Sequence, residues 1–285
     1  MPARTLYAAQ QATIVTNANT TGNFAVQSAS AETSIPVDDL LILGKFGSAG
    51  RHQKEVATCK SDLKIFLAAT GTTTAGALAG SFLAELTGET VEGKVSTITV
   101  SPNGFTMSGI VSSIGIDHSQ GNYAMCDISF VGVGEPDYAA VPTTVGGAGG
   151  SPASAIEIQP ITTGIQIFDT AGVLTAACPA SAKFSLDIPN EVISCLGGQI
   201  AGGQTDVSGS NVQVGKPPYK GSITVEGTSA EEVSKLVFKG GLGESADVSC
   251  VINDGKLISR SFNQNAGDVG ANYSFTLEGV DVTLT

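Results

Sequence analysis

The sequence contains a long internal repeat, and this repeat limits the chain to folds that can be built twice. Residues 35–44 (IPVDDLLILG) align without a gap with residues 188–197 (IPNEVISCLG) at an offset of 153 residues. Two shorter pairs have nearly the same offset: Asn103-Gly104 with Asp254-Gly255, and Asn122-Tyr123 with Asn272-Tyr273. A repeat of this length indicates a duplicated domain, because the units of solenoid proteins are about 20–50 residues long.

The repeat predicts two domains in the 285 residues, each large enough to bury its own core. The first would span residues 1–140, with an extended N-terminal arm over residues 1–33, and the second would span residues 156–285. Residues 141–155 between them are rich in Gly, Pro and Ser, which is typical of a linker.

Each half shows the same order of predicted elements. An alternating strand is followed by a helix, expected over residues 75–86 in the first half and 230–239 in the second. Two strands then flank an Asn-Gly or Asp-Gly turn, a strong hairpin signal, and a last strand runs to residue 133 or 284. With 36 glycines, abundant Thr, Ser and Val and only 14 % charged residues, the predicted fold class is β-dominated α+β. It consists of two similar β-sandwich or barrel domains, each with a flanking helix.

Both halves also place a long, Gly-rich segment at the same point, over residues 44–58 and 197–218. Compact domains rarely keep such long loops without a use, so the pair predicts contacts between subunits. The candidate assembly-loop residues are Gly44, Arg51, Lys54, Gly197, Gly203 and Lys216.

The net charge of −12 and the pI near 4.5 argue against a surface that holds nucleic acid or anionic membranes. The first 18 residues lack the apolar core of a secretory signal, and no stretch approaches the roughly 20 apolar residues of a membrane helix. The five cysteines contain no C-x-x-C spacing, and their odd number excludes a complete set of disulfides. We therefore expect buried thiols and assembly in a reducing compartment. We therefore expect a cytoplasmic chain without a membrane partner.

No catalytic pattern emerges, and the sequence predicts neither an enzyme nor a cofactor or metal site. Asp117-His118-Ser119 contains the side chains of a hydrolytic triad, but neighbouring residues on a strand point to opposite faces. Residues 44–50 lack the G-K-[ST] ending of a phosphate loop, and neither a metal-spaced Cys/His cluster nor an EF-hand register occurs. Residues 263–268 (NQNAGD) could hold a calcium ion, but a connection between strands is the preferred interpretation.

With this element order and the stretches IPVDDLLILGKFGSAGRHQKEVATCKSDLKIFL and TITVSPNGFTMSGIV, the chain resembles the major tail tube proteins of long-tailed bacteriophages. The resemblance implies β-barrel or sandwich domains, six to a ring, stacked into a tube through which DNA leaves the capsid. It also implies that the long loop reaches a neighbouring subunit or ring. Members of this family ordinarily supply one tube domain per chain, whereas this chain is expected to supply two.

The resemblance implies a homo-oligomer in the virion tail, assembled in the host cytoplasm together with other tail proteins. Three chains would form each pseudo-hexameric ring; six would be needed if the second half is not a tube domain. DNA would pass without tight binding, because carboxylates that line a passage repel phosphates. The candidate acidic lumen residues are Asp117, Asp127, Glu278 and Asp281.

Rival interpretations remain. Another virion surface or decoration protein made of two β-sandwich modules is the main alternative. A carbohydrate-binding module is disfavoured, since aromatic residues make up only 6 % of the chain and tryptophan is absent.

Overall fold

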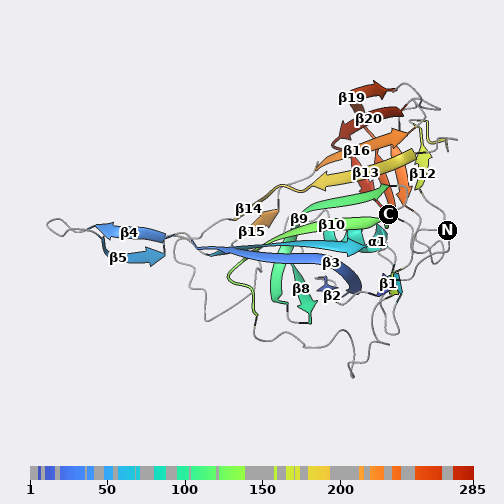
Figure 1. The fold of residues 1–285 in the computed structure, drawn as a ribbon. Coiled ribbons are helices and arrows are strands. Elements are labelled where there is room, and N and C mark those ends of the chain that lie inside the picture. The colour runs from blue at the N-terminus through green and yellow to red at the C-terminus, as the bar shows by residue number, and fades with distance from the viewer. Residues whose placement is uncertain are drawn as a thin grey trace.

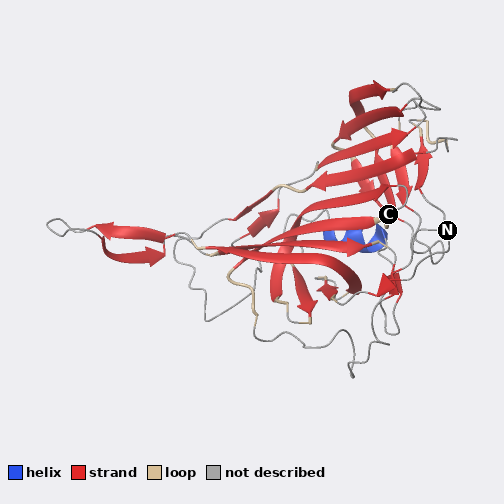
Figure 2. Cartoon of the chain, viewed as in Figure 1, coloured by secondary structure: helices blue, strands red, loops and turns tan. Residues whose placement is uncertain are grey.

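A computed structural model covers the whole chain. The residues that the structure describes are 6–7, 10–16, 20–35, 37–41, 48–53, 57–67, 69–70, 80–87, 95–102, 104–119, 122–138, 157–158, 165–169, 171–173, 179–192, 212–214, 219–227, 233–238, 248–264 and 272–285. Strands dominate these residues and one helix accompanies them, in agreement with the expected β-dominated class (Figure 2).

Six antiparallel strands close a barrel in the first half of the chain (Figure 1). Their order is β10-β6-β3-β2-β8-β9, and β10 pairs with β9 to complete the circle. The strands are β2 (Gln11–Val15), β3 (Thr21–Ser34), β6 (Thr58–Phe66), β8 (Ser96–Ser101), β9 (Thr106–Ser119) and β10 (Met125–Val133). Closure gives each participating strand two neighbours, although β2 covers β3 only over residues 21–25.

The barrel forms because apolar residues alternate with polar ones along these strands. Leu63, Ile114 and Phe130 point inward and are at most 1 % exposed. Burying a side chain of this size stabilises the fold by about 1.5–3 kcal/mol relative to leaving it in water. The period of two therefore decides which face of each strand lies against the core.

β9 joins the barrel to the rest of the sheet. Residues Ser113 to Asp117 pair with β10 on one edge and with β13 (Pro179–Asp187) on the other. Beyond β13 the sheet continues through β16 (Lys220–Gly227) and β20 (Asn272–Gly279) to β19 (Lys256–Asn263), which is its last strand. One antiparallel sheet thus runs across both halves of the chain (Figure 1).

The two halves of this sheet repeat the same strand order. The run β3-β6-β10-β9 is followed by β13-β16-β20-β19, each with antiparallel neighbours. β-Bulges fall at matching places: Gln27 on β3 and Ala180 on β13 are skipped in the pairing, as are Ser112 on β9 and Ile258 on β19.

A four-stranded sheet and the helix complete the core. The sheet has the order β12-β17-β18-β21, formed by β12 (Ile165–Phe168), β17 (Lys235–Phe238), β18 (Val248–Ile252) and β21 (Val282–Leu284). The helix α1 (Gly80–Thr87) contacts β9 of the barrel as well as β18 and β21. Its buried residues Phe82, Leu83 and Leu86 belong to one hydrophobic cluster that includes residues of both halves.

The predicted helix over residues 230–239 is wrong, because β17 occupies residues 235–238. Leu236, Val237 and Phe238 are all buried between β12 and β18. A short apolar run of this kind fits a strand with both faces covered as well as a helix, so periodicity alone could not distinguish them. The helix expected over residues 75–86 is confirmed from Gly80 onward, and residues 75–79 lie outside the described part.

Each segment predicted as a long loop contributes one strand of a two-stranded sheet, and the other strand precedes the segment. β4 (Val37–Leu41) and β5 (Ser48–Gln53) pair with each other and project away from the barrel as an arm (Figure 1). β14 (Asn190–Val192) and β15 (Val212–Val214) pair in the second half. The remaining short strands β1 (Leu6–Tyr7), β11 (Glu157–Ile158) and β7 (Ala69–Thr70) form a small sheet in the order β1-β11-β7.

Two further expectations need correction. The predicted N-terminal arm contains β2 and most of β3, whose residues Ala12, Ile14 and Phe24 are buried in the barrel. The predicted hairpin β8–β9 is confirmed, whereas β18 and β19 do not pair and belong to different sheets.

The turn between β18 and β19 is held by Asp254. Its Oδ1 accepts hydrogen bonds from the backbone N–H groups of Val280 (2.9 Å) and Asp281 (2.8 Å). These bonds connect the β18–β19 turn to the turn that follows β20. The chain passes here from the four-stranded sheet, which contains β18, to the continuous sheet, which contains β19.

Candidate functional site

The candidate functional site is the face of the continuous sheet that points away from the core, here called the polar face. Because the strands are antiparallel and in register, side chains line up in rows across them. One row contains Ser28, Lys64, Asp127, Gly115, Ser185, Ser222, Glu278 and Lys256, and the next contains Ser30, Asp62, Ser129, Ser113, Asp187 and Lys220. None of these residues is buried.

The opposite face is apolar across the same eight strands. One row there contains Val26, Ile65, Cys126, Ile116, Phe184, Ile223, Leu277 and Leu257. All but the last are buried, and Leu257 on the edge strand β19 is 36 % exposed. The sheet therefore has one side for packing and one side that remains available for contact with other molecules.

Three of the four predicted acidic lumen residues lie on the polar face. Asp117 on β9, Asp127 on β10 and Glu278 on β20 all point outward, while Asp281 is an exposed residue between β20 and β21. Among the described residues of this face, acidic side chains outnumber basic ones: Glu32, Asp62, Asp117, Asp127, Asp187, Glu226 and Glu278 stand against Lys60, Lys64, Lys183, Lys220 and Lys256.

Charges on the polar face are paired across strands. Lys64 Nζ lies 3.8 Å from Asp127 Oδ1, and Lys220 Nζ lies 3.1 Å from Glu278 Oε2. Partial burial raises the pKa of the Asp127 carboxyl above its ordinary value, and the Lys64 ammonium offsets part of that rise. Exposed ion pairs of this kind contribute at most about 1 kcal/mol each, so they set the surface charge more than the stability.

Hydroxyl groups fill the spaces between the charges. Ser185 and Ser222 share a hydrogen bond of 2.7 Å, and Thr224 and Thr276 share one of 3.1 Å. Ser181 Oγ donates to Glu226 Oε2 at 3.0 Å. These bonds link neighbouring strands across the polar face.

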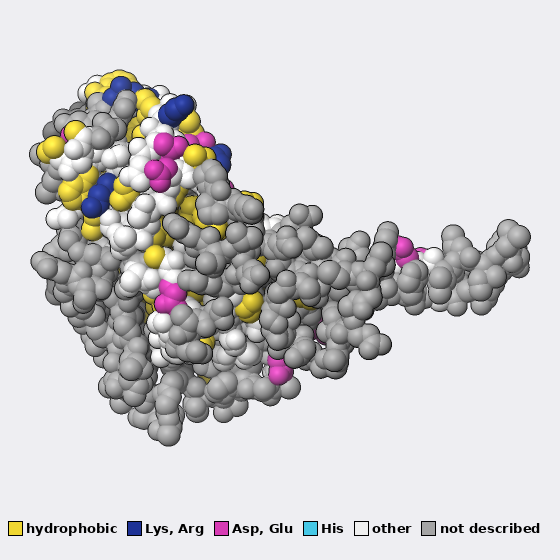
Figure 3. Space-filling model, turned by 180° about the vertical axis from the view of Figure 1, so that it is seen from behind, with side chains coloured by type: hydrophobic (Ala, Val, Ile, Leu, Met, Phe, Trp, Pro, Cys, Tyr) yellow, Lys and Arg dark blue, Asp and Glu magenta, His cyan; other side chains and the backbone are white. Residues whose placement is uncertain are grey.

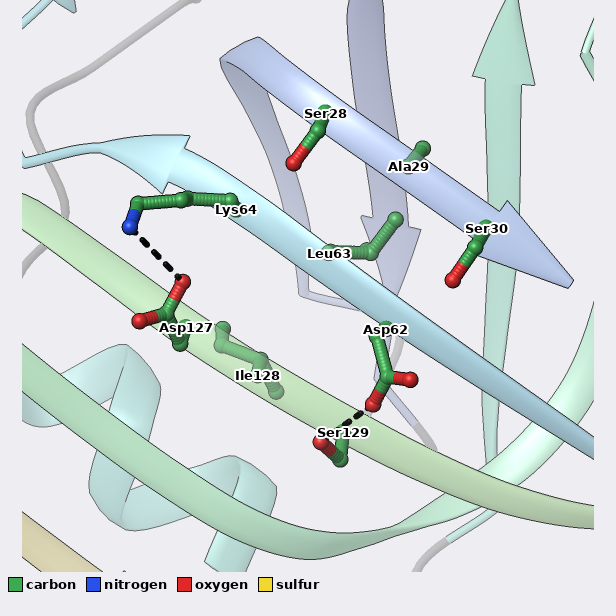
Figure 4. A pocket seen from close by; sticks show the side chains of 9 residues that line it. All are labelled: Ser28, Ala29, Ser30, Asp62, Leu63, Lys64, Asp127, Ile128 and Ser129. Carbon is green, nitrogen blue, oxygen red and sulfur yellow. Dashed lines mark hydrogen bonds and ion pairs between the residues drawn. The ribbon is translucent and has the colours of Figure 1, made fainter.

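A depression of about 340 Å³ lies on the polar face where β3, β6 and β10 run side by side (Figure 4). Its charged side chains are Asp62, Lys64 and Asp127, and Ser129 Oγ donates a 2.6 Å hydrogen bond to Asp62 Oδ1. Figure 4 shows Lys64 directed at Asp127 and Ser129 directed at Asp62. Each charged group here has a partner within the depression, and the lining contains no histidine or cysteine to act as a base or nucleophile.

His118 and Asp117 lie on opposite faces of β9, as the alternation predicted. Asp117 is paired with Lys183 on the polar face, while His118 is paired with the buried Ala182. The His118 Nδ1 atom is buried and has no hydrogen-bond partner, and burial lowers the pKa of the imidazole. No triad geometry exists at this place.

The described cysteines are structural. Cys59, Cys126 and Cys250 are free and buried, as expected from the sequence. Burial raises the pKa of all three thiols, which keeps them protonated and unreactive at neutral pH. Cys178 and Cys195 lie outside the described residues.

The predicted assembly-loop residues are only partly placed. Arg51 lies on β5 of the projecting arm. Gly44, Lys54, Gly197, Gly203 and Lys216 lie outside the described residues. The polar rows themselves were not predicted, although the alternation of Ser, Lys, Asp and Glu along β13 and β16 is a signal that could have revealed them.

Within the described residues, no three or more His, Cys, Asp or Glu side chains are grouped so that they could hold a metal ion. No helix of the described part has the length and apolar character needed to cross a membrane. No known protein-family model matches the chain, and no curated protein matches its sequence.

Proposed function

We propose that this chain is a structural subunit of a tube that conducts DNA, as expected from its resemblance to phage tail tube proteins. The polar face carries the proposal, because it continues across both halves of the chain and has an excess of carboxylates over ammonium groups. A passage lined by this face would repel phosphates, so that DNA could slide through without binding.

We further propose that each chain supplies two tube domains, residues 1–140 and 156–285, and that three chains form a pseudo-hexameric ring. The recurrence of the strand order and of both bulges supports this count. The rings would stack into the tail of a virion assembled in the host cytoplasm, in contact with other tail proteins. The chain would have no enzymatic activity, cofactor or membrane partner.

Negative-stain electron microscopy of the purified full chain tests this function. Tubes, or rings with a central hole and threefold symmetry, are the expected result. Rings of six chains would show that the second half is not a tube domain. Compact monomers at every concentration would overturn the proposal and favour a virion surface or decoration protein.

A further inference from the structure

Among the strands that the structure describes, the continuous sheet has two open edges. At one end, β20 is the one described strand that pairs with β19, and all eight residues of β19 are exposed. At the other end, β3 pairs with β6 on one edge, while β2 covers the opposite edge only over residues 21–25. The backbone N–H of Val26 still bonds to Gln10 on the β2 side. Beyond it, no described strand lies against this edge of β3.

The chain contains a template for joining these edges. Inside the molecule, β9 of the first half pairs with β13 of the second half. The bulges at Ser112 and Ile258 make β19 the equivalent of β9, at an offset of 146 residues. Those at Gln27 and Ala180 make β3 the equivalent of β13, at an offset of 153. The two strands with open edges, β19 and β3, are thus the equivalents of β9 and β13, which pair with each other inside the molecule.

We infer that copies of this chain join head to tail, with β19 of one copy pairing antiparallel to the outer edge of β3 in the next. Shifting the β9–β13 register by the two offsets aligns six pairs of described residues. They are Ser259 with Ser34, Arg260 with Thr33, Ser261 with Glu32, Phe262 with Ala31, Asn263 with Ser30, and Gln264 with Ala29.

The apolar side of the new junction would cover an exposed phenylalanine. Phe262 lies on the core-facing side of β19, next to Tyr273, yet it is 59 % exposed. Its equivalent in the internal junction, Ile116, is fully buried against Phe184. In the new junction Phe262 would lie against Ala31, so the phenylalanine is on the other strand of the pair and its partner is a smaller residue.

The polar side is compatible as well. The internal pair of Asp117 with Lys183 becomes the neutral pair of Asn263 with Ser30, and Ser261 faces Glu32. None of the six new pairs places like charges opposite each other, which would be destabilising. The segment of β3 that would pair, residues 28–34, contains no proline, the residue that commonly protects an open edge.

Exposed apolar residues gather at the same end of the molecule. Leu257, Ile258 and Phe262 on β19 and Val280 after β20 are each at least 36 % exposed. Figure 3 shows yellow hydrophobic atoms at the top of the molecule, the end where Figure 1 places β19. A second copy of the chain would cover part of this surface and extend the polar face without a break. The inference rests on the proposed function in one respect: if the chains form a ring, β19 and β3 are the edges through which neighbouring chains in that ring would pair.

Site-specific cross-linking tests the register. Paired residues of antiparallel strands have Cα atoms about 4.5–5.5 Å apart, within the range of a disulfide. The full chain with Ser261→Cys and Glu32→Cys should form disulfide-linked dimers and higher multiples on oxidation, seen on non-reducing gels. The matched control with Ser261→Cys and Ser28→Cys displaces one thiol by four residues, about 13 Å along β3, and should not. Equal linkage in both variants, or in neither, would overturn the pairing.

A second pair of variants tests the apolar contact without cysteine chemistry. Phe262→Lys should weaken self-association about tenfold or more in sedimentation, because the burial of a large apolar side chain is lost. Val173→Lys changes a side chain of nearly the same exposure, 60 %, in the turn after β12 and should leave self-association unchanged. Equal effects of the two changes would count against the inference.

The same samples separate the inference from the proposed function. Tubes or rings without register-specific cross-links would refute the β19–β3 pairing and leave the tube function standing. Register-specific cross-links in open fibres or short chains would support the pairing and refute the ring, since a head-to-tail contact closes only at a suitable rotation.

Discussion

Replacing Phe184 with alanine tests whether the two halves of the chain share one core. Phe184 is fully buried on β13, between Ile116 of β9 and Ile223 of β16. Truncating a buried phenylalanine costs about 3–5 kcal/mol, because the lost contacts leave a cavity. For a protein of this size a loss of about 4 kcal/mol lowers the melting temperature by roughly 10 °C.

The measurement is calorimetry and urea unfolding of the unassembled full chain at low concentration. Because the sheet and the hydrophobic cluster continue through both halves, we expect one transition that shifts as a whole. The matched control is Phe262→Ala, the same truncation at a site that is 59 % exposed, which should cost less than about 1 kcal/mol. Two separate transitions, of which only one moves, would refute the shared core, as would equal losses in the two variants.

Three other changes have defined outcomes. Gly132→Ala on β10 places a methyl group against a backbone carbonyl oxygen of β9 and should cost about 1–3 kcal/mol in urea unfolding, whereas Gly115→Ala, with no neighbour nearer than 3.8 Å, should be nearly neutral. Burial lowers the pKa of His118 despite the nearby Asp117 carboxylate. The folded state therefore resists protonation of this imidazole, and the free energy of unfolding should fall as pH drops below about 6.5. His118→Gln should reduce this fall between pH 7.5 and 5.5, and an unchanged slope would show that His118 is not its cause. Deleting residues 48–55 removes β5 from the arm and should abolish ring stacking in electron micrographs without lowering the melting temperature; tubes that still form would show that the arm has no part in assembly.

The repeat seen in the sequence located one strand boundary well. Ile-Pro follows β3 at residue 35 and β13 at residue 188, and the bulges at Gln27 and Ala180 have the same offset of 153 residues. Asn122-Tyr123 and Asn272-Tyr273 were a poorer guide, since the first pair precedes β10 and the second opens β20. Turn-forming residues recur in many places. A matching dipeptide is therefore weaker evidence for the alignment of the two halves than a pair of matching strands.

Other features depended on contacts that no local pattern encodes. β2 and the start of β3 belong to a segment rich in small and polar residues, which suggested an arm. Ala12 and Phe24 are nevertheless buried, because the barrel needs these strands to close. The polar face arises from eight strands lying in one register, and the sequence alone predicts the alternation within a strand but not which strands become neighbours.

The position of β9 has a mechanical consequence. Residues Ser113 to Asp117 have a neighbouring strand on each side, one from the barrel and one from the second half. Hydrogen bonds and buried side chains therefore hold the halves together independently of the peptide connection between β10 and β13. Cutting that connection should leave a two-fragment complex that migrates as one particle, so that covalent continuity matters for bringing the halves together during synthesis more than for keeping them together afterwards.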